Sequence, residues 1–170
     1  MQTLQTHFAM FANYNAWANR RLLAAVRDLS PADFHAEGGA FFKSIAGTLN
    51  HMLVTDRIWM HRFTGQGESY PKLDLILFGE IGPLEAARIV EDARVESYVA
   101  GLDDAALDGK FRYRRVSSPE AFEQSLAPAL AHFFNHQTHH RGQAHGLLTG
   151  LGRTAPELDL LFFQREAGIV

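Results

Sequence analysis

The chain has 170 residues, of which 46% are hydrophobic, and its formal net charge at pH 7 is −3. This length suffices for a buried core without covalent cross-links, and the acidic balance gives no electrostatic reason to expect binding to DNA or RNA. The sequence has no cysteine, which excludes disulfides and thiolate–metal bonds, so any metal site must use imidazole, carboxylate or water ligands.

The sequence opens without a basic segment followed by an apolar run, and no stretch approaches the roughly 18 consecutive apolar residues of a membrane span. We therefore expect a soluble, cytoplasmic protein with neither a membrane nor a nucleic-acid partner. No internal repeat, linker or low-complexity stretch suggests a second domain, so we expect residues 1–170 to form a single domain.

Hydrophobic periodicity predicts four long helices, and glycine and proline residues mark where they end. The predicted helices cover about residues 3–28, 44–64, 83–102 and 125–149. A Ser-Pro-Ala-Asp turn and a Gly-Gly loop separate the first two, and a long connection, residues 65–82, separates the second from the third. Residues 108–116 are typical of a short strand or loop, and residues 157–166 of a short helix or extended segment. Four long helices with little strand signal predict an all-α helical bundle.

The first predicted helix carries two amides on its apolar face. Asn15 and Asn19 lie in the middle of an arc of hydrophobic residues, so both should point inward and need hydrogen-bond partners. They could orient histidines or substrate, or they could be satisfied by neighbouring backbone and buried water.

The second predicted helix, which Ser44 should cap, carries one unusual carboxylate and one candidate ligand. Asp56 lies on the broad apolar arc, where a buried carboxylate needs a donor or a positive partner. That partner could be the second ring N–H of a metal-binding histidine, or it could be Arg20 or Arg21, which we favour. His51 lies on a secondary face of the same helix, away from its widest apolar arc.

The segment Lys110–Arg115 holds four cations in six residues. Arg112 and Arg114 could form one wall of a pocket for an anionic substrate, such as a carboxylate-bearing thiol. More often such a run is a solvated edge that discourages aggregation, which is the interpretation we favour.

The fourth predicted helix carries the most informative pattern, because His136 and His140 stand four residues apart. At about 100° per residue, both lie on the apolar arc that should face the core. The other members of that arc are Ala129, Phe133, Ala144 and Leu147. Two imidazoles one turn apart can hold one metal ion, whereas a lone buried histidine is more often simply hydrogen-bonded. A third ligand must come from another element, and His51 is the best candidate.

Two signatures, Asn50-His51 and the run Asn135–Gln143, resemble the DinB/YfiT-like family of metal-binding proteins. The segments Tyr14–Asn19 and Leu158–Phe163 resemble that family's opening and closing segments, so the resemblance covers essentially the whole chain. It implies an antiparallel four-helix bundle that binds one divalent metal through three histidines. Carried over to this sequence, these ligands are His51, His136 and His140. The resemblance also implies a homodimer, which the two tryptophans and thirteen phenylalanines favour.

Three protein ligands leave a coordination position for water or substrate, whereas structural sites usually close with four. A fourth ligand such as His132 or His139 would therefore indicate a structural role. An all-imidazole set suits several transition metals, of which we expect zinc or nickel. We expect a metal-dependent hydrolase or thiol S-transferase that acts on a small molecule, possibly a thiol, with no catalytic residue yet assigned. The alternative is a helical bundle that binds a metal or ligand without turnover.

Overall fold

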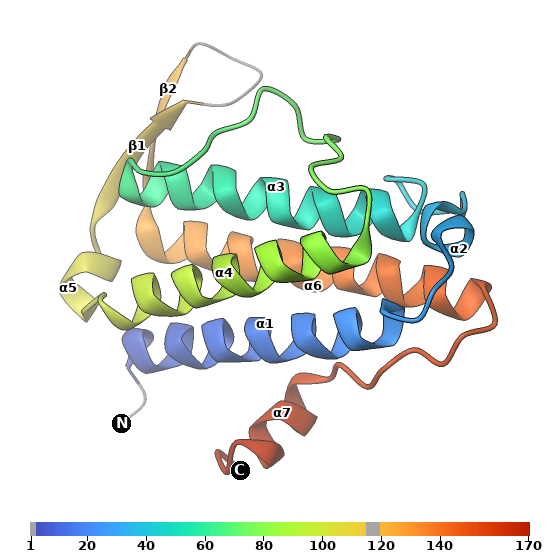
Figure 1. Cartoon of the computed structure of the whole chain (residues 1–170). Helices are drawn as coiled ribbons and strands as arrows, with labels where there is room; N and C mark the ends of the chain where they lie inside the picture. The colour runs from blue at the N-terminus through green and yellow to red at the C-terminus, as the bar shows by residue number, and fades with distance from the viewer. Residues whose placement is uncertain (1–2, 115–119) are drawn as a thin grey trace.

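The computed structural model describes residues 3–114 and 120–170, and it is mostly helical with one small sheet (Figure 1). Four long helices dominate it: α1 (Leu4–Val26), α3 (Ile45–Thr64), α4 (Ile81–Ala100) and α6 (Leu126–Gly150). Three short helices accompany them: α2 (Pro31–His35), α5 (Asp104–Leu107) and α7 (Leu160–Glu166). Strands β1 (Lys110–Arg114) and β2 (Ala121–Ser125) pair antiparallel. None of the helices in the described ranges is long and apolar enough to cross a membrane.

The four long helices predicted from periodicity are confirmed to within a few residues at their ends. The predicted turn after α1 is instead the short helix α2, because Ser30 accepts a hydrogen bond from the amide of Asp33 and Pro31 suits the first helical position. Strand β2 was not predicted, since its five residues directly precede α6 and show no pattern of their own. Ser44 caps α3 as expected.

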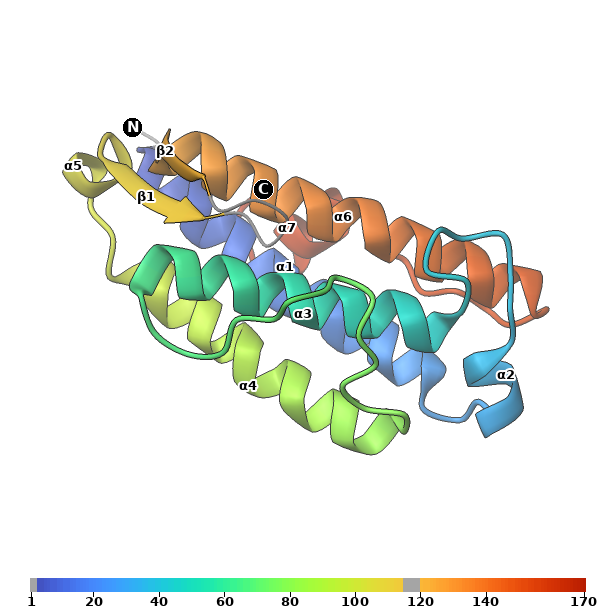
Figure 2. The ribbon, with the colours of Figure 1, turned by 90° about the horizontal axis from the view of Figure 1, so that it is seen from above.

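The long helices are not all antiparallel to the helices against which they pack. Helix α1 packs against α4 and α6, and α3 packs against the same two helices. In Figure 1, α1 and α6 run one way while α3 and α4 run the other way, so of these four packed pairs α1–α4 and α3–α6 are antiparallel and α1–α6 and α3–α4 are parallel. Residues 65–80 make this possible, because they return along the length of α3 before α4 begins (Figure 2).

Two apolar clusters fill the two ends of the helix assembly. One gathers side chains from the end of α1, the start of α3 and the end of α6; its largest members include Leu22, Phe34, Ile45, Met52 and Leu148. The other gathers the start of α1, the end of α4 and the start of α6; its members include Phe8, Met60, Val99, Leu130 and Phe133. Leu147, predicted to lie in the core, is only half-buried, whereas its neighbour Leu148 is fully buried.

A buried polar layer separates these two clusters. Asp56 of α3 lies 2.7 Å from the guanidinium of Arg88, which also lies 3.1 Å from Asp92 one turn along α4. Asp56 additionally accepts a hydrogen bond from the amide of Gln137. The predicted pairing of Asp56 with Arg20 or Arg21 is therefore wrong, because those two side chains lie on the exposed face of α1.

The amides of α1 complete this layer. Asn19 donates to Asp92 at 2.9 Å, and Asn15 donates to the same oxygen at 3.4 Å. Both accept hydrogen bonds from Arg141 of α6, which is almost fully buried. Thus Asn15 and Asn19 bridge a buried arginine and a buried aspartate. The layer links all four long helices, and its two carboxylates, Asp56 and Asp92, are matched by two arginines, Arg88 and Arg141.

The two-stranded sheet covers one end of the assembly, with β1 against α3 and β2 against α6. Along β1, Phe111 and Tyr113 are partly buried while Lys110, Arg112 and Arg114 are exposed. Helix α7 lies on the side of α1 that is away from α3 and the sheet (Figure 1). It packs against α1 through an aromatic cluster of Tyr14, Trp17 and Phe163.

Candidate metal centre

The structure brings the three predicted histidines together between α3 and α6. The Nε2 atom of His51 lies 3.3 Å from that of His136 and 3.2 Å from that of His140. The two histidines of α6 have their Nε2 atoms 3.1 Å apart. The helical spacing brings the α6 pair together, and the antiparallel packing of α3 on α6 adds the third ring. His51 and His140 are buried and His136 is half-buried.

Hydrogen bonds at the opposite ring nitrogens orient two of these imidazoles. The Nδ1 atom of His51 donates to the carbonyl oxygen of Leu73 at 2.8 Å, in the connection that crosses α3. The Nδ1 atom of His140 donates to Oε1 of Gln143 at 2.8 Å, and Gln143 in turn lies 3.2 Å from His139. A proton on Nδ1 leaves Nε2 of the neutral ring as an acceptor, so these bonds turn acceptors toward the centre of the cluster.

Asn50 anchors the connection that supplies the Leu73 carbonyl. Its side-chain oxygen accepts from the amides of Leu77 and Phe78, and its amide donates to the carbonyls of Ala46 and Phe78. Asn50 is completely buried, so this clamp is shielded from water. In the Asn50-His51 pair, Asn50 therefore fixes the connection, and His51 donates a hydrogen bond to the Leu73 carbonyl of that connection.

Phe42 closes the cluster from the side of the loop that follows α2. Its ring stacks on His51 with centroids 3.7 Å apart and meets His140 edge-on at 5.5 Å. Lys43, the next residue, has a φ of 66°, in the left-handed region that residues other than glycine rarely adopt. Gly47 permits this loop to approach α3, since a Cβ there would lie 2.1 Å from the carbonyl oxygen of Phe42.

Burial keeps the three imidazoles neutral. The pKa of His51 is lowered to about 4, chiefly by burial and to a smaller extent by the nearby His140, although the hydrogen bond to the Leu73 carbonyl raises it. The pKa of His136 is lowered to about 3, chiefly by burial, with smaller contributions from His140 and His51. Burial also lowers the pKa of His140, although its bond to Gln143 opposes this. Neutral imidazole is the form that binds metal ions.

The donor set fits a divalent transition metal. In tetrahedral sites with zinc–nitrogen bonds of about 2.0–2.1 Å, neighbouring ligand nitrogens lie roughly 3.3 Å apart. The three Nε2–Nε2 distances here are 3.1–3.3 Å. Acceptor nitrogens that face one another share no proton, so a cation between them would satisfy all three. Within residues 3–114 and 120–170, these histidines form the one group of three or more potential metal-binding side chains.

A cleft of about 660 Å³ leads to this centre. His51 and His136 line it, and its walls come from α3, the crossing connection, β1, β2 and α6. The wall residues include Thr55, Trp59, Arg62, Leu73, Tyr113 and His132. A groove of about 740 Å³ between α1, α6 and residues 156–160 is larger, but it contains none of the three histidines. Of these two concavities, the smaller cleft is therefore the one that adjoins the histidine cluster.

The remaining histidines of α6 do not join the cluster. His132 is exposed, packs against Trp59 with ring centroids 5.3 Å apart, and has its own centroid 5.9 Å from that of His136. His139 is exposed beside Gln143, and His145 lines the larger groove. Neither His132 nor His139 belongs to the group that could hold the metal.

Several residues of the site carried no sequence signal that we recognised. Phe42 and the Leu73 carbonyl come from loops, where no periodicity reports orientation. Gln143 stands three residues after His140 on the same helix, and that spacing would have suggested their hydrogen bond. The basic segment of β1 lies at the outer edge of the cleft, with Tyr113 in its wall and Arg112 paired to Glu123 at 2.9 Å.

The comparisons with known proteins agree with one another. The family model described as "DinB family" matches residues 1–169. "Protein DinB" of Bacillus subtilis (strain 168) is 25% identical over 152 residues, which cover 86% of this chain and 87% of that protein. A crystal structure of a DinB-like protein from Bacillus cereus ATCC 10987 superposes with a TM-score of 0.65 and 19% identity. It covers 85% of this chain and 91% of the other. This structural likeness shows a shared fold.

Proposed function

Because the chain belongs to the DinB family, we propose that it binds one divalent transition metal, zinc or nickel, and acts on a small molecule there. The proposed ligands are His51, His136 and His140. The observation that carries the proposal is the convergence of their three Nε2 atoms beside a cleft that His51 and His136 line. Three ligands leave a position for water or substrate, which is typical of catalytic rather than structural sites.

When bound, such a metal supplies a Lewis-acidic position that lowers the pKa of a water or thiol. The protein's own side chains would position the reactants. Trp59 and Tyr113 provide aromatic walls, and a cleft of about 660 Å³ lies within the roughly 300–1,000 Å³ of small-molecule sites. His132, a further imidazole in the cleft wall, is placed to accept or return a proton.

The reaction that we propose is hydrolysis or thiol S-transfer. In hydrolysis a water would lose a proton, add to an ester or amide carbonyl and replace the alcohol or amine that leaves. In S-transfer a thiol would lose its proton and form a carbon–sulfur bond to an electrophile as the leaving group departs. Within this proposal residues 1–170 act as a single domain, and the four long helices act as a four-helix bundle of the DinB type. The protein assembles as a homodimer, which would cover apolar side chains such as Phe41 that one chain leaves exposed.

Two substrate panels test the proposal on protein loaded with zinc or nickel. One panel combines low-molecular-weight thiols with a chromogenic electrophile, and the other contains activated esters and amides. Acceleration that depends on the metal, disappears in His136→Ala and survives in His145→Ala would support an enzyme. The panel that responds would distinguish transfer from hydrolysis.

If neither panel responds although the metal is bound at full occupancy, a bundle that binds metal or ligand without turnover becomes the better description. Light scattering at micromolar concentration tests the dimer separately, and a monomer mass would contradict that part of the proposal.

A further inference from the structure

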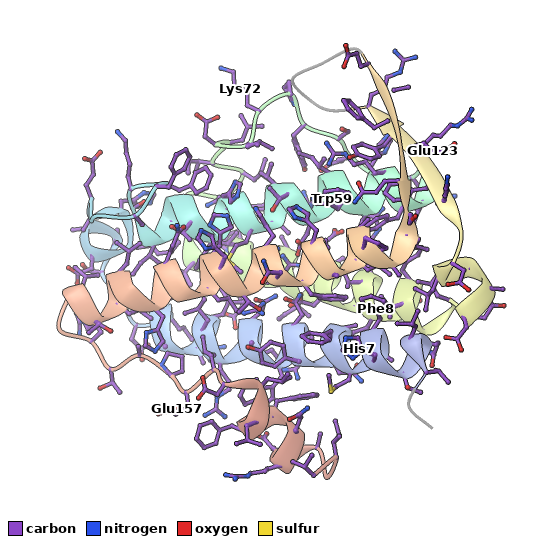
Figure 3. The ribbon with its side chains drawn as sticks, turned by 180° about the vertical axis from the view of Figure 1, so that it is seen from behind. His7, Phe8, Trp59, Lys72, Glu123 and Glu157 are labelled. Carbon is purple, nitrogen blue, oxygen red and sulfur yellow. The ribbon has the colours of Figure 1, made fainter. Side chains whose placement is uncertain are left out.

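A second concavity of about 550 Å³ continues the cleft away from the histidines. It lies between β1 and the first part of the crossing connection, and it shares Arg62, Pro71 and Tyr113 with the cleft. A molecule with one end at the histidines could therefore extend into this outer groove. Figure 3 places Trp59 on α3, Lys72 on the connection above it and Glu123 on the neighbouring strand.

The outer groove is strongly cationic in a protein that is acidic as a whole. Three arginines line it, Arg62, Arg112 and Arg114, together with His61, and none of its described lining residues is a carboxylate. In the adjoining cleft, Asp74 is the one carboxylate among the described lining residues, and Lys72 offsets it. Because the formal charge of the whole chain is −3, this concentration of positive charge is local.

Arg62 is held in a defined position at the junction of the two concavities. Its guanidinium carbon lies 4.6 Å from the ring centroid of Trp59 and 4.7 Å from that of Tyr113. The two ring centroids are 5.7 Å apart, so the guanidinium lies against both rings at once. A guanidinium held in this way loses little further freedom when it binds an anion, because its planar donors are already oriented. It is also only partly exposed, so its charge is less screened than that of a fully solvated side chain.

Arg112 supplies a second cation that is able to change partner. Its bond to Glu123 is 2.9 Å long, but the side chain of Arg112 is 81% exposed and that of Glu123 is 43% exposed. Exposed ion pairs of this kind are weak and readily exchanged. A ligand oxyanion could therefore recruit Arg112 without breaking a buried interaction.

We propose that this outer groove binds the oxyanion group, a carboxylate or phosphate, of the substrate whose reacting end lies at the histidine cluster. The inference rests on the proposed function, which it deepens by naming the substrate class. Arginine matches both oxyanions because its planar fork presents paired donors to them. The acidic net charge of the chain favours a small anion over a nucleic acid.

Trp59 offers a direct readout, because Arg62 stacks on it. In the full-length Trp17→Phe protein it is the one remaining tryptophan, so its fluorescence should report phenyl phosphate and benzoate, with benzyl alcohol as the uncharged control. We expect Arg62→Gln and Arg112→Gln to weaken binding of phenyl phosphate about fivefold or more, and higher salt to weaken it further. Arg62→Lys, which keeps the charge, should recover part of the affinity.

Arg21→Gln is the matched control, since the guanidinium carbon of Arg21 lies 4.7 Å from the ring centroid of Trp17 in the native chain, and Trp17→Phe keeps an aromatic ring at that position. Its affinity for phenyl phosphate should stay within about twofold of that of the parent. Circular dichroism of each variant verifies that the fold persists. Equal affinities in all variants, or tighter binding of a single-stranded oligonucleotide than of either small anion, would overturn the proposal.

Repeating the titration after removal of metal separates this inference from the proposed function. Anion binding that persists without metal and depends on Arg62 supports the groove even if no turnover is found. If anion binding is lost with the metal and is unchanged in Arg62→Gln and Arg112→Gln, the anion binds at the histidines, and the proposal that the outer groove binds it is wrong.

Discussion

Arg88 lies 2.7 Å from Asp56 in the middle of the four long helices, and both side chains are almost fully buried. The same guanidinium lies 3.1 Å from Asp92, so one cation serves two carboxylates. Burial raises the pKa of Asp56 to about 7 even though the charge of Arg88 lowers it. The layer therefore holds its charges at an electrostatic cost that only the complete network offsets.

Arg88→Leu should accordingly be strongly destabilising. It leaves two buried carboxylates without their cation, which we expect to lower the free energy of unfolding by about 3–5 kcal/mol. Arg20→Leu, on the exposed face of α1, should change it by no more than about 0.5 kcal/mol. Urea denaturation followed by circular dichroism measures both free energies of unfolding. A loss in Arg88→Leu as small as that in Arg20→Leu would show that the layer is dispensable.

Gly47→Ala should disturb the cover of the histidine cluster. The added Cβ would lie 2.1 Å from the carbonyl oxygen of Phe42, so the loop must shift at a cost of about 1–3 kcal/mol. Gly146→Ala, within α6 and with open space around the new methyl group, should stabilise the protein by about 0.5–1 kcal/mol. Thermal melts of the pair should therefore move in opposite directions, and a gain in stability for Gly47→Ala would contradict the described loop.

Leu148→Ala and Leu147→Ala test which of the two leucines α6 presents to the core. Leu148 is fully buried in the first apolar cluster, so its truncation should cost about 2–5 kcal/mol. Leu147 only packs against that cluster from the side, and its truncation should cost less than half as much. Denaturant midpoints of the two variants decide the matter, and the reverse order would mean that α6 presents the other leucine to the core.

Metal content tests the proposed ligands. His51→Ala, His136→Ala and His140→Ala should each lose stoichiometric zinc or nickel after dialysis, because two imidazoles bind far more weakly than three. His145→Ala, on the same helix but in the other groove, should retain it. Elemental analysis gives the result, and equal metal content in all four variants would remove the proposed centre.

Metal-free protein should lose stability as the pH falls. The folded-state pKa values of about 4 for His51 and about 3 for His136 lie below the unfolded value of about 6.5, so the unfolded chain binds these protons more readily. The stabilising contribution is therefore complete above pH 6.5 and declines as the pH falls from about 6.5 to 3, by about 3–5 kcal/mol for each histidine. Denaturation midpoints across this range should fall less in His51→Asn/His136→Asn, and identical pH profiles would refute the assignment.

The sequence predicted the long helices and the histidine cluster well because both follow from local spacing. Periodicity places His136 and His140 on one face of a helix whatever packs against it. His51 required more than a pattern, since its secondary face gave no sign of its partner helix, and its assignment depended on the family resemblance. The structure brings it within 3.3 Å of both α6 histidines.

Relations between helices were where the sequence interpretation failed. The partner of Asp56 could not be identified, because a carboxylate on an apolar arc shows that a cation is needed but not which helix supplies it. Leu147 was placed in the core by idealised angles, and an error of one residue exchanges it with Leu148. The length of the connection, residues 65–80, likewise does not reveal that α3 and α4 run in the same direction.

That shared direction has a consequence for how the protein folds. Since α3 and α4 run in parallel, neither forms an antiparallel hairpin with its neighbour in sequence, and the antiparallel pairs join segments far apart along the chain. Asn15 and Asp92 are separated by 77 residues, and His51 and His140 by 89. Closing such long loops costs entropy before any contact is gained, which slows folding relative to bundles made of successive hairpins. During synthesis, His51 of α3 can meet the two histidines of α6 only after α6 has emerged, so the histidine cluster is among the last features of the fold to form.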